Sequence, residues 1–198
     1  MDITLEGIAA ILAALLGGGG LHRIFIEVKD RLNTAKSKEA FTDISLIYEA
    51  MQDIIANTSI NRVLILSTHN DGQEIKPGTK LYGSVLYETV TTPFTSVKAN
   101  YQNIPLDAAY VQILVELMTS GYVVTVTDTM QKGVLKDLYE KEGVKFSKVY
   151  YLTDNKRKKI WYMSCATEAD IKNLSGYERV IVDKRVAEIS RILKKYSK

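Results

Sequence analysis

The chain has 198 residues, with 26 basic and 23 acidic side chains and a formal net charge of +3. A balance this even lacks the strong basic field that is typical of nucleic-acid-binding proteins, so we expect no nucleic-acid partner. With 46% hydrophobic and 25% charged residues, the composition excludes disordered and fibrous classes. The length suits one domain with its own core and an appendage.

Cysteine and histidine are scarce, which limits the chemistry that the chain can carry. The single cysteine, Cys165, excludes an intramolecular disulfide and a cysteine-based zinc site. The two histidines, His22 and His69, lie far apart in the sequence and do not indicate a metal site. We therefore expect no metal, a reducing compartment and a buried structural role for the thiol.

The chain starts with an apolar segment, residues 3–21, whose 19 residues include a single charge, Glu6. As a helix it would be about 28 Å long, close to the ~30 Å hydrocarbon thickness of a bilayer. A cleaved signal peptide would need a basic start, and this start is acidic. We expect residues 1–22 to form a membrane-anchoring helix. The alternative is a helix in the core of a homo-oligomer, ended by the glycines at 17–20.

Basic residues follow this segment and set its expected orientation. Residues 23–36 include Arg23, Lys29 and Arg31. Under the positive-inside rule, the N-terminus would face outward and the rest of the chain would be cytoplasmic. A virion or a soluble oligomer is the alternative location. The same stretch mixes apolar and charged residues, and it predicts a helical connector to a domain over residues 37–198.

The first part of this domain combines one helix with two strands. Apolar residues recur at intervals of three and four over residues 40–55, which predicts an amphipathic helix that ends near Asn57. Strand patterns follow at residues 61–68 and 80–91, with turn residues after each. Residues 94–101 favour a loop or a weak extended piece.

The middle of the domain begins with Pro105, which suits the first turn of a helix. The apolar period then continues as far as Gly121, which predicts the end of that helix. Residues 122–127 are rich in β-branched side chains and favour a strand. A short helix follows and is expected to end at Gly143.

The last part of the domain predicts a hairpin with arms at residues 147–152 and 159–165. Thr167 and Asp170 approximate a capping box and predict a short helix. A long helix is expected from Tyr177 to the end of the chain. The complete order lacks the regular alternation of strands and helices found in a doubly wound fold. It favours an α+β fold with an antiparallel sheet flanked by helices.

Several passages of this pattern resemble the GAF domain family, the cousins of PAS domains. Residues 61–67 (NRVLILS) and 81–87 (LYGSVLY) are similar to the first two GAF strands, and residues 117–128 to the family's helix, glycine, strand and aspartate passage. The strand pair over 149–165 and the terminal helix are similar to its last elements. The likeness spans about residues 38–197 and implies a GAF/PAS-like sensing module that pairs through its terminal helices.

The resemblance also places six tyrosines on elements that surround or back the ligand cradle of a GAF domain: Tyr82, Tyr87, Tyr110, Tyr122, Tyr151 and Tyr162. Aromatic walls with polar tips suit a planar ligand, so we interpret these as candidate ligand contacts. The alternative is packing in the core and on the sheet surface. No bilin-attaching cysteine and no cyclic-nucleotide signature is evident, so the cofactor stays unknown.

Four consecutive basic residues occupy the expected hairpin tip: Lys156, Arg157, Lys158 and Lys159. In a membrane-anchored domain they predict a contact with anionic lipid headgroups, at about 1 kcal/mol per basic residue. Contact with a partner or with nucleic acid is a second interpretation. A solvated turn is the alternative.

Catalytic chemistry is not indicated. Ser67, His69 and Asp71 lie within five residues of one another, whereas triads gather residues from separate elements. This group therefore favours a turn, and we expect no enzyme. The leading hypothesis is a membrane-tethered, non-enzymatic GAF-like sensory or regulatory module that signals through helix packing. The alternative is a structural scaffold, or a virion- or mobile-element-associated membrane protein, that oligomerises through its N-terminal helix.

Overall fold

The computed structural model describes residues 20–70, 75–91, 96–155 and 159–197. The chain divides into two units, Met1–Ser45 and Leu46–Lys198. The expected anchor over residues 3–21 lies almost entirely outside the described residues. Of the helices that the structure describes, none is long and apolar enough to cross a membrane.

The long helix α2 (Gly20–Asn57) begins in the first unit and ends in the second. Its described residues in the first unit are mostly charged or polar, and residues 33–39 are exposed. Helical structure in the connector and the end of the following helix at Asn57 are thus confirmed, with both predicted segments joined in one helix.

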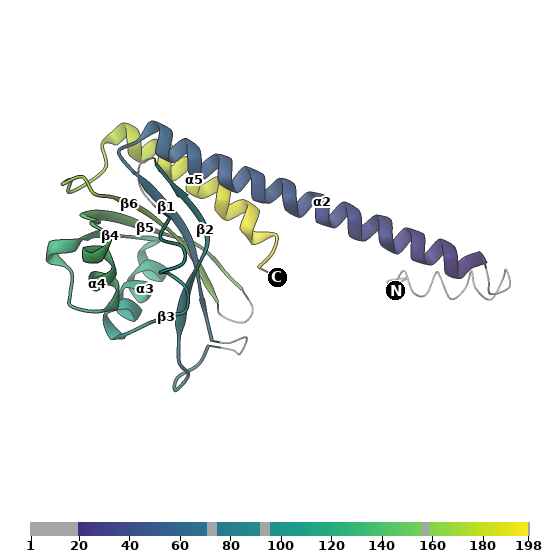
Figure 1. Cartoon of the computed structure of the whole chain (residues 1–198), viewed down its shortest axis with the longest axis horizontal. Coiled ribbons are helices and arrows are strands. Elements are labelled where there is room, and N and C mark those ends of the chain that lie inside the picture. The colour runs from purple at the N-terminus through teal and green to yellow at the C-terminus, as the bar shows by residue number, and fades with distance from the viewer. Residues whose placement is uncertain (1–19, 71–74, 92–95, 156–158, 198) are drawn as a thin grey trace. The chain divides into compact units, whose positions relative to one another are not determined.

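The second unit is built on a six-stranded sheet in the order β3-β2-β1-β6-β5-β4 (Figure 1). All its neighbouring strands run antiparallel, as the sequence predicted. The strands in chain order are β1 (Arg62–His69), β2 (Tyr82–Val90), β3 (Ile104–Pro105), β4 (Tyr122–Val126), β5 (Phe146–Asp154) and β6 (Ile160–Thr167). The pairing of β1 with β6 joins the first and last hairpins in one sheet.

Helices cover both faces of the sheet. The end of α2 and the terminal helix α5 (Gly176–Lys194) pack on one face, whereas α3 (Ala108–Ser120) and α4 (Val134–Lys141) pack on the other. The alternation of side chains along β1 sends Val63 toward the first face and Leu64 toward the second. The central strands are therefore buried on both faces, and the unit has two hydrophobic clusters.

The two predicted stops of helices are confirmed at glycines. Gly121 follows α3 with φ of 81°, and its N–H donates to Leu117 O at 2.9 Å. Gly143 follows α4 with φ of 69°. A left-handed backbone costs a residue with a Cβ about 1 kcal/mol or more, which is why glycine is suited to both positions.

Two predicted helix starts are wrong. Pro105 pairs with Tyr82 in β3, and Asp107 instead caps α3 through its carboxylate. Thr167 ends β6, and its hydroxyl accepts from Ala169 N–H at 3.2 Å, so it forms a turn and the short helix predicted after it is absent, because the next helix, α5, begins at Gly176. In both cases pairing within the sheet, a long-range interaction, overrides a local capping signal.

Candidate functional site

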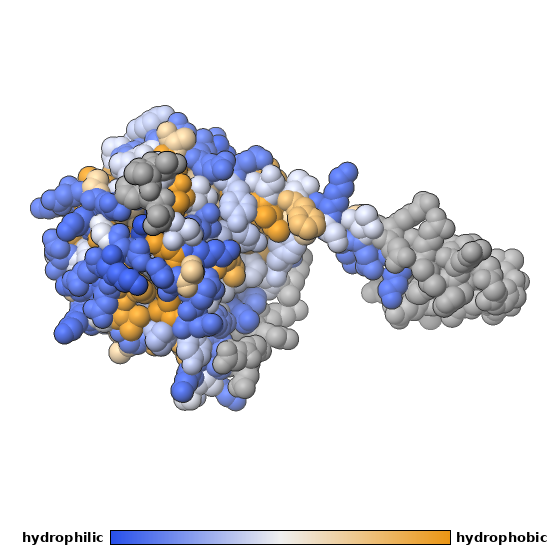
Figure 2. All heavy atoms as spheres, in the orientation of Figure 1, coloured by the Kyte–Doolittle hydropathy of each residue, from blue (hydrophilic) through white to orange (hydrophobic). Residues whose placement is uncertain are grey.

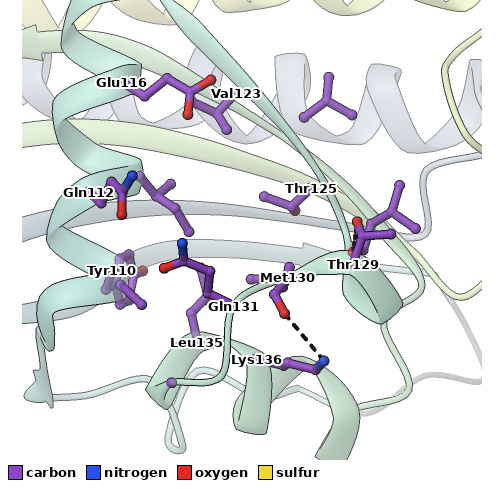
Figure 3. A pocket seen from close by; sticks show the side chains of 15 residues that line it. Tyr110, Gln112, Glu116, Val123, Thr125, Thr129, Met130, Gln131, Leu135 and Lys136 are labelled. Carbon is purple, nitrogen blue, oxygen red and sulfur yellow. Dashed lines mark hydrogen bonds between the residues drawn. The ribbon is translucent and has the colours of Figure 1, made fainter.

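An open pocket lies between α3, β4 and α4, and we call it the α3–α4 pocket (Figure 3). Its volume is about 220 Å³. The buried residues Val123 and Thr125 of β4 line one side, and Tyr110 of α3 and Leu135 of α4 line the others. The short 3-10 helix η1 (Thr127–Thr129) and the loop after it complete the wall.

One carboxylate fixes the two helices that form the pocket. Asp107 Oδ1 accepts from Tyr110 N–H at 2.8 Å and so caps α3. Its Oδ2 accepts from Val134 N–H at 2.8 Å at the start of α4. Gly133 permits this approach, because a Cβ there would lie 2.6 Å from Asp107 Oδ2. The pocket walls are therefore joined at a single side chain.

The pocket lining combines apolar surface with hydrogen-bonding groups. Gln112 and Gln131 extend into the space between α3 and the loop before α4, as Figure 3 shows. Lys136 donates to Met130 O at 3.3 Å and pairs with Glu140 at 3.8 Å. Exposed amides offer both donors and acceptors, so the lining suits a small ligand that carries both kinds of group.

A closed tyrosine cluster lies directly behind the pocket, and Tyr110 lines both spaces. Tyr110 and Tyr162 join their hydroxyls at 2.9 Å in the buried interior, where Tyr101 and Tyr139 complete the cluster. The cavity among them measures about 20 Å³. A space of that size holds on the order of one water, so these side chains fill the interior themselves.

Three phenols of this cluster, those of Tyr101, Tyr110 and Tyr162, have raised pKa values and are held in their neutral form. Burial raises the pKa of Tyr110, and its neighbour Tyr162 raises it further. Burial likewise raises the pKa of Tyr101 and Tyr162. A desolvated phenol resists ionisation because the phenolate would lose its hydration. The cluster is therefore suited to neutral hydrogen bonding and not to acid–base chemistry near neutral pH.

The structure brings together only part of the predicted tyrosine set. Tyr110 and Tyr162 meet in the cluster, and half-buried Tyr151 packs against the same hydrophobic core. Tyr82 stacks on His69 with ring centroids 5.9 Å apart.

The other two tyrosines belong to the opposite face of the sheet. Tyr87 meets Tyr48 of α2 edge to face at 5.6 Å. Tyr122 is 50% exposed and lies beside Tyr150 of β5. Neither lines the α3–α4 pocket, because alternate residues of a strand point to opposite faces.

The basic hairpin tip and the group of Ser67, His69 and Asp71 lie only partly within the described residues. Lys156, Arg157 and Lys158 lie outside the described residues, and Lys159 donates its N–H to Asn155 Oδ1 at 3.1 Å. Asp71 also lies outside them. His69 Nε2 instead contacts Ser84 Oγ at 2.8 Å.

Cys165 is fully buried, and burial raises the pKa of its thiol, as suits the structural role that the sequence indicated. In the described parts of the chain, no group of three or more metal-ligating side chains occurs.

The same architecture occurs in solved structures of other proteins. No family model and no curated protein matches the chain, but solved structures do. The GAF domain of a two-component sensor histidine kinase from Bacillus halodurans has 10% identity and a TM-score of 0.55, with 77% of this chain and 93% of that one covered. The chain has the GAF domain fold.

Two further structures agree with this assignment. The PixJ GAF domain of Thermosynechococcus elongatus, in its blue-light absorbing form, has 11% identity and a TM-score of 0.53, with 82% of this chain and 88% of that one covered. A GAF domain/HD domain protein from Geobacter sulfurreducens has 10% identity and a TM-score of 0.53, with 75% and 90% covered. The GAF resemblance predicted from the sequence is confirmed at the level of fold.

Sequence reasoning missed the residues that shape the pocket. Asp107 carried an available signal, because aspartate directly before an apolar helical period is a favoured N-cap. Gln112 and Gln131 carried none, since an exposed glutamine on a helix or loop is ordinary surface. Only the packing of α3 and α4 on the same face brings these amides to one pocket.

Proposed function

We propose that this chain is a non-enzymatic sensory or regulatory module that binds a small ligand in the α3–α4 pocket and is tethered to a membrane by residues 3–21. The observation that carries the ligand part is the open 220 Å³ pocket with amide groups at its rim. It lies against a closed tyrosine cluster, and unlike the 20 Å³ cavity of that cluster it is open and large enough for a small molecule.

The output of such a module would be a change in helix packing on the opposite face. The terminal helix α5 is joined to the end of α2 by a short ion pair, in which Arg185 Nε donates to Asp53 Oδ2 at 2.7 Å. Glu178 of α5 also accepts from Ser59 N–H at 2.6 Å. A ligand that shifts β4 and β5 would act on α5, which packs on β5. Such a shift requires a ligand that binds the two arrangements with different affinity.

Ligand binding can be tested with a thermal-shift screen of nucleotides and small metabolites on the full chain. A ligand present at 100 times its Kd should stabilise the protein by about 2.7 kcal/mol. The variants Gln112→Ala and Gln131→Ala should remove this shift, whereas Gln52→Ala, an exposed glutamine on α2, should keep it. A shift that survives both pocket variants would place binding elsewhere and contradict the proposal.

The tether can be tested by carbonate extraction of membranes that contain the full chain or a chain without residues 1–21. We expect the full chain to stay with the membrane and the shortened chain to be released, because only the full chain can bury its apolar segment in the bilayer. Release of both would exclude the anchor. A defined high-order oligomer that disappears on the same deletion would instead support the scaffold hypothesis.

A further inference from the structure

A second recess lies on the opposite face of the sheet from the α3–α4 pocket, between β4, β5 and α5. It measures about 540 Å³ and is lined in part by Tyr122, Val124, Lys148, Tyr150, Arg179 and Asp183. We call it the Lys148 groove. Its volume falls in the range of small-molecule sites, which is roughly 300 to 1,000 Å³.

A buried lysine forms the floor of this groove. The side chain of Lys148 is 6% exposed, and its ammonium lies 4.5 Å from the ring centre of Tyr122 and 4.7 Å from that of Tyr150. Cation–π contacts with two rings offset part of the cost of removing the charge from water. The ion pair with Asp183 Oδ1 spans 3.8 Å, which is longer than a hydrogen bond.

Two donors on the groove floor, the Lys148 ammonium and the Tyr150 hydroxyl, make no short hydrogen bond. Within the described parts of the chain, the Lys148 ammonium donates no hydrogen bond. The hydroxyl of Tyr150, a residue only 5% exposed, likewise has no partner within hydrogen-bond distance there, although the Asp183 carboxylate interacts with both groups at longer range. Buried polar groups in folded proteins nearly always have partners, so two unused donors that line one recess indicate that an acceptor completes them.

The charged side chains of the groove indicate the net charge of the ligand that fits it. The three charged side chains of its lining are Lys148, Arg179 and Asp183, which leave one net positive charge. A single negative charge balances this set, whereas a dianion would meet repulsion from Asp183. The ring of Tyr122 and the side chains of Val124 and Val186 offer flat and apolar surface beside these donors. The groove thus combines a monoanion site with a wall for a planar body.

We propose that the Lys148 groove binds an organic monoanion, a carboxylate on a planar apolar body. The carboxylate accepts from the Lys148 ammonium and the Tyr150 hydroxyl, and the planar body lies against Tyr122. Arg179 stands at the rim as an exposed second cation. This site is separate from the α3–α4 pocket and does not depend on the function proposed above.

The test is binding of benzoate to the full chain, followed by saturation-transfer NMR and isothermal titration calorimetry. Benzoate should bind, and its uncharged isostere benzamide should bind at least about tenfold more weakly. The variant Lys148→Met should weaken benzoate binding by a similar factor. The variant Lys145→Met, an exposed lysine just before the same strand, should leave it unchanged.

Two further variants separate the Lys148 groove from the α3–α4 pocket. Tyr150→Phe removes only the unused hydroxyl and should weaken benzoate binding even where Lys148→Met fails to fold. Gln112→Ala, in the other pocket, should leave benzoate binding intact. The proposal is overturned by the absence of benzoate binding, by equal affinity for benzamide, or by full retention of binding in both groove variants. Displacement of benzoate by equimolar inorganic phosphate would also overturn it, because the planar body would then contribute nothing.

Discussion

The Asp107 carboxylate accepts one backbone hydrogen bond on each oxygen, from the first turn of α3 and from the first turn of α4. The first turns of helices leave N–H groups without partners inside the helix, and a capping carboxylate meets that need and also favours the positive end of the helix dipole. In this protein one residue does so for two helices, and these helices form the walls of the α3–α4 pocket.

Removal of this double cap should be costly. We expect Asp107→Ala to lower the free energy of unfolding by about 2 kcal/mol, roughly 1 kcal/mol per cap. Asp107→Asn keeps one acceptor oxygen and should lose about half as much. Urea denaturation followed by circular dichroism measures both, with Asp170→Ala, an exposed aspartate outside the helices and strands, as the control. An Asp107→Ala protein as stable as the control would show that neither cap contributes.

At the scale of elements, α5 begins with a capping box that also reaches another segment. Ser175 Oγ accepts from Glu178 N–H, and the Glu178 carboxylate accepts from Ser175 N–H at 2.8 Å. The same carboxylate accepts from Ser59 N–H at 2.6 Å, just after the end of α2. These hydrogen bonds lower the pKa of Glu178 from 4.5 to about 2.

The lowered pKa predicts a pH dependence of stability. Because the folded protein holds the Glu178 carboxyl below its usual pKa, the stabilisation is complete above pH 4.5 and is lost as the pH falls toward 2. Glu178→Gln should lower the free energy of unfolding by about 1 kcal/mol at pH 7. The difference from the unmodified protein should shrink across that acid range.

Urea denaturation at several pH values measures this difference, with the exposed Glu168→Gln as the control. A difference that stays constant from pH 7 to pH 2 would disprove the role of the Glu178 charge.

At the scale of the whole second unit, the sheet separates two hydrophobic clusters. One contains Ile54 of α2 and is covered by α5, and the other contains Ile104 of β3 and is covered by α3 and α4. The face that Figure 2 shows is mostly hydrophilic, with a group of apolar side chains over the α3–α4 region. Helices cover both clusters, and each cluster stabilises the fold by burying apolar side chains on its own side of the sheet.

The separation predicts additive effects of mutations on opposite faces. Ile54→Val and Ile104→Val should each lower the free energy of unfolding by about 1 kcal/mol. Together they should lower it by the sum, within about 0.5 kcal/mol, because they share no partners. A double-mutant cycle by urea denaturation measures the difference, and the pair Ile54→Val and Ile189→Val within one cluster serves as comparison. A coupling above 1 kcal/mol across the sheet would contradict two separate cores.

The sequence by itself determined most of the elements, their order and the GAF-like fold, but not the short strand β3 or the turn after Thr167. Helical and strand periods are local properties, so α3 could be read from its apolar spacing and its end from Gly121. The start of α3 was harder to predict. Pro105 is a stronger local signal for a helix start than Asp107, but Pro105 pairs in β3 and Asp107 is the cap.

Only the tertiary structure decided which side chains meet. A tyrosine on a strand points to one face or the other according to its register, and bulges between Ile65 and Leu66 and between Tyr151 and Thr153 shift that register. Tyr162 of β6 points to the face that α3 covers and meets Tyr110 there, whereas Tyr122 of β4 points to the other face and lies beside Lys148. The Lys148 groove joins residues as distant in sequence as Tyr122 and Ser190, whereas the α3–α4 pocket is formed within residues 109–136. In both, packing of the helices on the sheet brings the lining together.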